Sequence, residues 1–145
     1  MSEALPDPEA PDLAPDERLL QSFAPDPAVY TRDHAWLAVL AAALSALSFW
    51  LVWRPLAFAG PPVAILIVAA RHKSAADRDM TERWHLTDRR LVGPGGQEIE
   101  LKRIDKLRPF GSAVQVTTNS GSRHLVRFQR KPRLTLERIE AARDA

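Results

Sequence analysis

Histidine, cysteine and serine are the side chains most often used in acid–base, metal and nucleophilic chemistry, and this sequence offers few useful spacings of them. It has four histidines and no cysteine. No two histidines stand four residues apart, as on a zinc-binding helix, and no serine lies in a G-x-S-x-G elbow. The lack of cysteine excludes disulfides and cysteine-ligated metals. We therefore expect no catalytic residues, no cofactor and no metal.

Other residues that resemble parts of catalytic sites have plainer interpretations. His85 and His124 alternate with apolar neighbours in predicted strands, which indicates exposure to solvent. The run 93–96, GPGG, joins two predicted strands, so it predicts a turn and not a phosphate-binding loop. Asp88 is followed by two arginines and is expected to form a local ion pair that fixes a turn.

Basic side chains are the remaining candidates for function. Residues 71–145 hold seventeen Lys and Arg against ten Asp and Glu, a net charge of +7. Such groups attract anionic headgroups by about 1 kcal/mol each beside a membrane, although a solvated face is the alternative. Nucleic acid is not favoured as a partner, because neither a basic recognition helix nor an aromatic platform is predicted. The candidate patch for a lipid or an acidic partner comprises Lys102, Arg103, Lys106, Arg108, Arg127, Arg130, Lys131 and Arg133.

These residues follow an apolar stretch, residues 35–70, in which Arg54 is the only charge. Residues 35–53 would form a helix of roughly 28 Å, close to the thickness of about 30 Å of the bilayer core. Trp36 and Trp50 lie near its two ends, where aromatic rings favour the membrane interfaces. This segment predicts a transmembrane helix.

Residues 55–70 are predicted to return across the membrane after a turn at Arg54-Pro55. They contain Gly60-Pro61-Pro62, which indicates a kink near Pro61 or an irregular start. The alternatives are a single span, a re-entrant segment, or a buried helical hairpin in a soluble protein. The cations that follow the second span favour a cytoplasmic location for both chain ends at the inner membrane.

The flanking regions differ sharply from this stretch. Residues 1–34 hold eight acidic and two basic groups and many prolines. They predict a mostly disordered tail, with one or two helical turns at 16–23, an extended segment at 24–32 and a helix cap near Asp33. Residues 71–80 are expected to connect the hairpin to the next domain as a continuing helix.

Residues 81–145 alternate with a period of two, and turn signals stand at 93–96 and 119–122. This pattern predicts a small antiparallel β-sheet or partial barrel with one buried face. Pro132 suits the first turn of a closing helix. The predicted fold class is therefore an α+β membrane protein, with a two-helix transmembrane hairpin before the β domain.

Residues 16–145 contain, in order, an ERLL…PDPAVY lead-in, the hairpin, WHLTDRRL at 84–91, a glycine turn, IELKRID, VQVTT-NSG-SRHLVRF and a final helix. This order of segments resembles that of the bacterial pleckstrin-homology-like membrane proteins. The resemblance implies a strongly bent sheet that approaches a barrel and is closed by a helix. It implies no catalytic residues.

Three functions remain open at this point. The first is a non-catalytic inner-membrane protein whose cytoplasmic module mediates protein interaction, self-association or assembly. The second is a module of the same architecture that senses anionic lipid. The third is a small accessory subunit of a membrane transport or respiratory complex, held by its hairpin.

Overall fold

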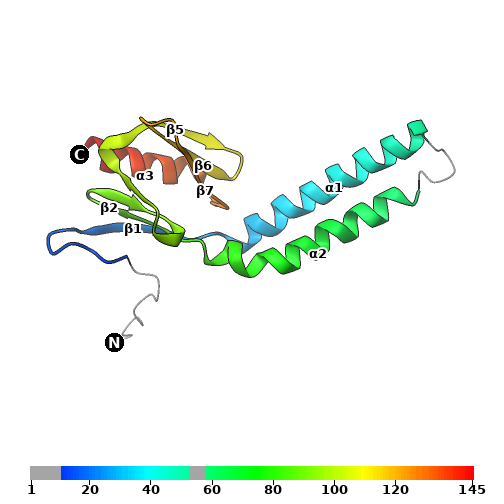
Figure 1. Ribbon diagram of the computed structural model, residues 1–145, viewed down its shortest axis with the longest axis horizontal. Coiled ribbons are helices and arrows are strands. Elements are labelled where there is room, and N and C mark those ends of the chain that lie inside the picture. The colour runs from blue at the N-terminus through cyan, green and yellow to red at the C-terminus, as the bar shows by residue number, and fades with distance from the viewer. Residues whose placement is uncertain (1–10, 53–57) are drawn as a thin grey trace. The chain divides into compact units, whose positions relative to one another are not determined.

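The structure, a computed structural model, describes residues 11–52 and 58–145. The chain divides into two compact units. The helical unit is Asp26–Met80, and the β unit joins the residues before it to Thr81–Ala145. The chain thus leaves the β unit after one strand and rejoins it after the helical unit (Figure 1).

The first helix of the helical unit, α1, is Pro27–Val52. Its cap is Asp26, whose carboxylate accepts the N–H groups of Ala28 at 2.8 Å and Val29 at 3.3 Å. The prediction of extended chain to residue 32 and a cap near Asp33 was therefore wrong. Asp26 followed by proline is a sufficient start signal, because proline fits the first helical position.

The second helix, α2, is Gly60–Thr81. Pro61 and Pro62 lie in its first turn, where their missing N–H groups remove no helical hydrogen bond. The predicted irregularity therefore coincides with the start of the helix. α2 continues through residues 71–80, as expected. The predicted turn at Arg54-Pro55 lies outside the described residues.

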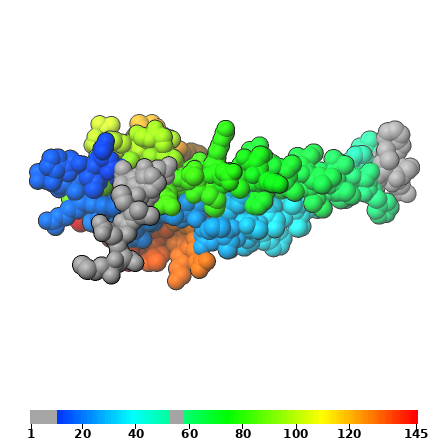
Figure 2. All heavy atoms as spheres, turned by 90° about the horizontal axis from the view of Figure 1, so that it is seen from below, coloured from blue at the N-terminus to red at the C-terminus, as the bar shows by residue number. Residues whose placement is uncertain are grey.

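Side-chain contacts join α1 to α2 near both ends of the pair. Gly60 lies against Ser45 and Phe49, so closely that an added Cβ would collide with both side chains. At the other end the His72 ring lies 4.9 Å from the ring of Tyr30 and 5.0 Å from that of His34. The two helices therefore run antiparallel, and Figures 1 and 2 both show them side by side.

The described helices differ in their capacity to cross a membrane. Within residues 11–52 and 58–145, α1 is the one helix long and apolar enough to do so, judged by length and composition. In α2 the uncharged part ends before Arg71 and measures roughly 16 Å, against about 30 Å for the bilayer core. The predicted pair of transmembrane spans is therefore not confirmed.

The described strands of the β unit form two antiparallel sheets, and the helix α3, Pro132–Asp144, follows them. This arrangement confirms the α+β class, the antiparallel strands and the C-terminal helix. The first sheet has the order β1 (Leu19–Phe23), β2 (Trp84–Thr87), β3 (Arg90–Val92), β4 (Glu98–Glu100), and the second β5 (Ile104–Phe110), β6 (Ala113–Thr118), β7 (Arg123–Val126).

One hydrophobic core serves both sheets and α3. Trp84 and Leu86 contribute from the first sheet, Val114 and Val116 from the second, and Ile139 from α3. Each is 4 % exposed or less. Residues two apart on a strand share a face, so the intervening residues of β2 and β6 face away from this core.

Strand β1 contradicts the prediction for the N-terminal region. Residues 16–23 were expected to form helical turns in a mostly disordered tail, but β1 pairs with β2, with Ser22 opposite His85 and Phe23 opposite Trp84. The local spacing of apolar residues fits a helix, and the partner strand lies beyond the whole helical unit. The β domain is thus residues 81–145 together with β1. Residues 1–10 lie outside the described part of the tail.

Candidate docking surface of the β unit

Strand β5 presents basic side chains on the outer face of the second sheet. Lys106, Arg108 and Phe110 stand at alternate positions, and all three are exposed. Lys106 lies opposite Thr117, which in turn lies opposite Arg123 on β7. Since neighbouring strands are about 4.8 Å apart, Lys106 and Arg123 lie roughly 10 Å from each other on this face.

Two large apolar side chains are exposed near the end of β5. Phe110 is 66 % exposed and Leu134, in the first turn of α3, is 45 % exposed. An open groove of about 640 Å³ lies beside these two side chains. Two cations and one acid are among its lining residues. The lining comprises Pro109, Gly111, Lys131, Pro132, Arg133, Leu134 and Glu137.

Gln129 holds the segment between β7 and α3 against the turn that follows β5. Its N–H donates to the carbonyl of Ser112 at 2.7 Å, and its side-chain oxygen accepts the hydroxyl of Thr135 at 3.2 Å. The preceding residue, Phe128, has φ of +54°, a conformation uncommon for non-glycine residues. The Gln129–Ser112 hydrogen bond holds the backbone of this segment at the Phe110 end of the sheet. The segment carries four predicted cations, Arg127, Arg130, Lys131 and Arg133, of which Lys131 and Arg133 line the groove beside Pro109 and Gly111.

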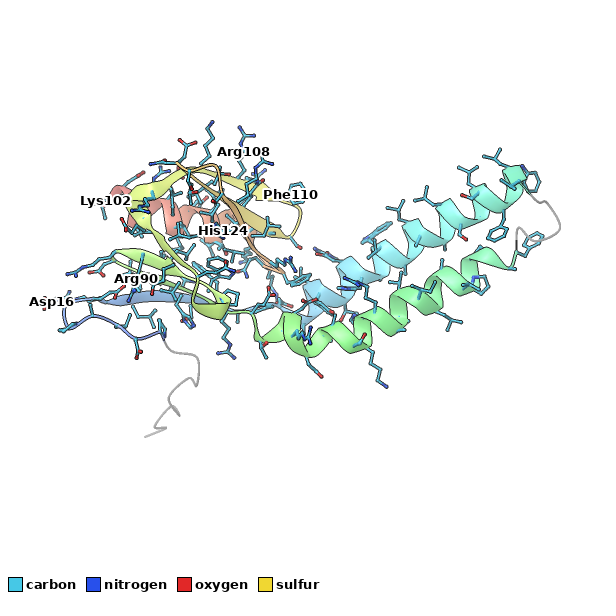
Figure 3. All side chains as sticks on the ribbon, viewed as in Figure 1. Asp16, Arg90, Lys102, Arg108, Phe110 and His124 are labelled. Atoms are coloured by element: carbon cyan, nitrogen blue, oxygen red, sulfur yellow. The ribbon has the colours of Figure 1, made fainter. Side chains whose placement is uncertain are left out.

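The eight predicted basic residues do not converge on one rim. With Arg108, five of them lie near the Phe110 end, and Lys106 lies midway along β5. Lys102 and Arg103 belong to a short 3₁₀ turn before β5, at the opposite end from Phe110 (Figure 3). Arg103 contacts the Glu100 carboxylate at 3.5 Å. We call the Phe110 group the basic tip: Arg108, Phe110, Arg127, Arg130, Lys131, Arg133 and Leu134.

Sequence reasoning missed the apolar part of the basic tip and Arg123. The alternation Lys106, Arg108, Phe110 was visible in the sequence and placed the aromatic ring on the same face as the cations. Leu134 could not be assigned in this way, because its position depends on how α3 packs against the second sheet. The combined surface has the chemistry to bind an acidic partner, with Phe110 as an apolar anchor.

A second polar cluster lies on the outer side of the first sheet. The Glu17 carboxylate accepts two hydrogen bonds of 2.8 Å from the Arg90 guanidinium. The Thr87 hydroxyl donates to it at 2.7 Å. Arg90 also contacts Glu98 at 2.7 Å. Asp88 was expected to form an ion pair with its neighbouring arginines. Arg90 instead pairs with Glu17 and Glu98.

This cluster shifts the acid–base equilibria of its members. The Arg90 hydrogen bonds lower the pKa of Glu17 from 4.5 to about 2, against the opposing effect of burial. Hydrogen bonds to Glu17 and then to Glu98 raise the pKa of Arg90. The pair stays charged at neutral pH and joins the N-terminal segment to the residues that follow the helical unit.

Two of the histidine predictions differ from the structure. His85, expected to be exposed, is 4 % exposed, and its Nδ1 lies 2.8 Å from the hydroxyl of Ser22 on the paired strand β1. His124 is half-buried, with Nδ1 at 3.2 Å from the Gln97 side-chain oxygen and its ring edge-on to Trp84. Within the described residues no cluster of three His, Cys, Asp or Glu could hold a metal ion.

Comparison with known proteins found no relative of this chain: no family model, no curated protein and no solved structure matches it. The basic tip and the cluster around Glu17 are therefore interpreted from their own geometry and chemistry.

Proposed function

We propose that this chain is a non-catalytic protein of the bacterial inner membrane. In this proposal α1 and α2 form a hairpin that enters the bilayer from the cytoplasmic side. The hairpin anchors the β unit, which binds a partner protein or a second copy of the chain through its basic tip and serves assembly.

The exposed apolar surface of the helical unit supports membrane insertion. Large apolar side chains are exposed on different sides of α1, among them Leu37, Val39 and Val52, which are 49, 58 and 84 % exposed. Covering so large an apolar surface requires lipid or another protein. Lipid is favoured because apolar residues surround the helix instead of forming one stripe.

The charge boundary falls at the same level on both helices. On α1 the last charged residue before the apolar part is Asp33, next to His34, and on α2 the first is Arg71, next to His72. The rings of His34 and His72 are 5.0 Å apart. Both helices therefore pass from polar to apolar surface at one depth, as expected at a membrane interface.

The observation that carries the proposal is the pairing of β1 with β2. Phe23 precedes α1 and lies opposite Trp84, which follows α2. Both residues must then be on the same side of any membrane. If α1 crosses the bilayer, the chain must return before residue 84. This reasoning favours a hairpin over the single span that α1 alone suggests.

The distribution of cations supports the cytoplasmic location of the β unit. The apolar part of α2 is followed closely by Arg71, Lys73 and Arg78. In the sequence between the two helices, Arg54 is the only charged residue. Cations close to a membrane span are enriched on the cytoplasmic side.

A pleckstrin-homology-like fold is part of the same proposal. Its support is the order of a four-stranded and a three-stranded antiparallel sheet around one core, followed by a C-terminal helix that packs into it. This order agrees with what the sequence resemblance implies.

The basic tip supports a docking role with an acidic partner. Phe110 and Leu134 supply exposed apolar area, and the surrounding cations supply charge complementarity, which steers association and fixes orientation. Anionic lipid is the second candidate, because an exposed aromatic ring among cations is also typical of surfaces that enter the headgroup region.

Co-purification of the full-length chain from native membranes in mild detergent tests this proposal. A double variant, Phe110→Ser with Lys131→Glu, should lose a stoichiometric partner, whereas Lys102→Glu, a charge reversal far from the tip, should keep it. A partner that the double variant retains would contradict docking at the tip and favour an accessory subunit held by the hairpin. Loss of salt-sensitive binding to anionic vesicles, without loss of any protein, would favour lipid instead.

A further inference from the structure

A groove of about 200 Å³ opens between α1 and α2, and all of its lining residues belong to the helical unit. The wall contributed by α1 contains two alanines, Ala35 and Ala38. The wall contributed by α2 contains the larger side chains of Ile65 and Val68. Because alanine has no atom beyond Cβ, the α1 wall leaves space between the helices. By the share of about 30 Å³ that one water occupies in the liquid, the groove holds roughly seven non-hydrogen atoms.

The groove changes from polar to apolar along its length. One end is formed by Thr31, His34 and His72, and the other end by Ala38 and Ile65. The two ends are separated by seven residues on each helix, which corresponds to roughly 10 Å. The polar end coincides with the charge boundary of the two helices. The apolar end therefore lies about two turns inside the proposed bilayer.

The side chains of the polar end are held in place by contacts within the helical unit. The His34 Nδ1–H donates to the Tyr30 carbonyl, and the Thr31 hydroxyl donates to the Pro27 carbonyl, both at 2.9 Å. The His72 ring stacks on the Tyr30 ring at 4.9 Å. This end is therefore preformed. Since Thr31 and His34 donate within α1, attraction of a charged molecule falls to the neighbouring residues.

Two cations follow the polar end directly on α2. Arg71 and Lys73 are exposed, and neither forms an ion pair within residues 11–52 and 58–145. Arg71 stands three residues after Val68, so it adjoins the groove wall on the helix surface. Long cationic side chains reach the headgroup level from such positions while their stems stay beside apolar surface. The mouth of the groove is thus suited to an anion.

The nearest acidic residues do little to offset these cations. On α1, the Asp33 carboxylate contacts the Arg32 guanidinium at 3.0 Å. On α2, Asp77 and Asp79 stand at least six residues after Arg71, which corresponds to roughly 9 Å or more along the helix. The surroundings of the polar end therefore remain cationic overall.

We propose that this groove binds an anionic glycerophospholipid of the cytoplasmic leaflet, with one acyl chain in the groove and the phosphate beside Arg71. Such a lipid has a charged phosphate, then polar ester groups, then hydrocarbon. The helix pair presents cations, then the polar end, then the alanine wall in the same order. Cationic pockets between membrane helices on the cytoplasmic side are typical sites for lipid headgroups. The inference rests on the proposed membrane hairpin and goes beyond it, because a hairpin alone requires only unselective contact with lipid.

Native mass spectrometry of the full-length chain tests the proposal, because it counts the lipids that stay bound when detergent is removed. The chain is released from micelles that contain equal amounts of phosphatidylglycerol, which is anionic, and phosphatidylcholine, which is zwitterionic. We expect each chain to retain one phosphatidylglycerol in preference to phosphatidylcholine. Equal retention of the two lipids would overturn the assignment of an anionic headgroup.

Matched pairs of variants assign the binding to the groove. Ala38→Leu should weaken phosphatidylglycerol binding at least about tenfold. Ala43→Leu, at an exposed alanine of α1 that does not line the groove, should leave it unchanged. Arg71→Gln should reduce the preference for phosphatidylglycerol, whereas Lys102→Gln, which removes a cation of the β unit, should not. Circular dichroism in micelles shows whether each variant keeps its helices.

A second groove-filling variant keeps the test decisive. Ala69→Leu fills the groove from α2 and repeats the measurement if Ala38→Leu loses helix. Unchanged lipid binding in both variants would overturn the proposal. A lipid-free dimer that Ala38→Leu dissociates would also overturn it, because a second copy would then occupy the groove. A chain that stays soluble without detergent and retains no lipid would contradict the membrane hairpin itself.

Discussion

The carboxylate of Glu17 and the guanidinium of Arg90 face each other through two parallel hydrogen bonds of 2.8 Å each. Glu17 precedes the helical unit and Arg90 follows it, so this ion pair closes the chain around all of α1 and α2. The Glu17 side chain is 2 % exposed. The Thr87 hydroxyl and the Ala14 N–H donate to the same carboxylate, at 2.7 and 3.1 Å. The Glu17 carboxylate is therefore buried and its hydrogen-bonding capacity is well satisfied.

Removing the charge of Glu17 should destabilise the β unit strongly. Breaking a buried ion pair from one side typically costs about 3 kcal/mol or more. In Glu17→Gln the Arg90 guanidinium loses its buried partner and keeps only its contact with the exposed Glu98 side chain. We expect Glu17→Gln to lower the free energy of unfolding by about that amount in urea titrations followed by tryptophan fluorescence. The control is Glu100→Gln, whose exposed contact with Arg103 is 3.5 Å long and should be worth about 1 kcal/mol or less. Equal losses in the two variants would show that the Glu17 pair contributes little.

The same carboxylate should make stability depend on acid. Its pKa is about 2 in the folded protein, against 4.5 without the interaction. A group whose pKa is lowered by folding stabilises the protein above its unfolded pKa, and this contribution disappears as the pH falls from about 4.5 towards 2. Urea midpoints measured across this window should fall more steeply for the wild type than for Glu17→Gln. Parallel curves would assign the acid sensitivity to other carboxylates.

Strand β1 should be necessary for the β unit to fold. Phe23 is 4 % exposed within the core, and Phe→Ala changes in cores cost about 3–5 kcal/mol. We expect Phe23→Ala to lose about that much stability, whereas Leu20→Ala, at a position 52 % exposed, should lose little. A fragment of residues 81–145 should be unfolded by circular dichroism and gain structure when a peptide of residues 11–25 is added. A stably folded fragment would show that β1 is dispensable.

Gly60 should control how closely the helices approach each other. Its neighbours, Ser45 and Phe49, leave no room for a side chain. Gly60→Leu should therefore separate α1 from α2 at that end and lower the resistance of the helical unit to heat and protease in micelles. Val63→Leu, a change at an exposed position on the same helix, is the matched control. Unchanged protease resistance in Gly60→Leu would mean that this contact is not needed to hold the pair.

Local patterns in the sequence predicted most elements of the β unit, because strand alternation and turn residues act over a few positions. Strands around the turns at 93–96 and 119–122 and the helix after Pro132 were found in this way. β1 was missed because only its distant partner, β2, makes it a strand. His85 was misassigned for a related reason, since its neighbour Ser22 lies on β1.

The candidate sites were predicted only in part. The cations of the basic tip were visible as a composition bias, but their gathering depends on Gln129, which binds the turn between β5 and β6 through Ser112. The buried partner of Arg90 is Glu17, and no spacing in the sequence relates the two residues. Side chains that meet across the inserted helical unit cannot be paired from local patterns.

The central claim is that α1 and α2 form a membrane hairpin whose two ends lie on the cytoplasmic side. Since the natural chain has no cysteine, single substitutions at Leu13, Phe58 and Ser120 each provide one thiol at an exposed position. These variants are exposed to a membrane-impermeant maleimide in intact spheroplasts and after permeabilisation. Labelling of Phe58→Cys in intact spheroplasts, with Leu13→Cys and Ser120→Cys labelled only after permeabilisation, is the predicted result. Labelling of Leu13→Cys and Ser120→Cys from opposite sides, or of Phe58→Cys only after permeabilisation, would contradict the hairpin.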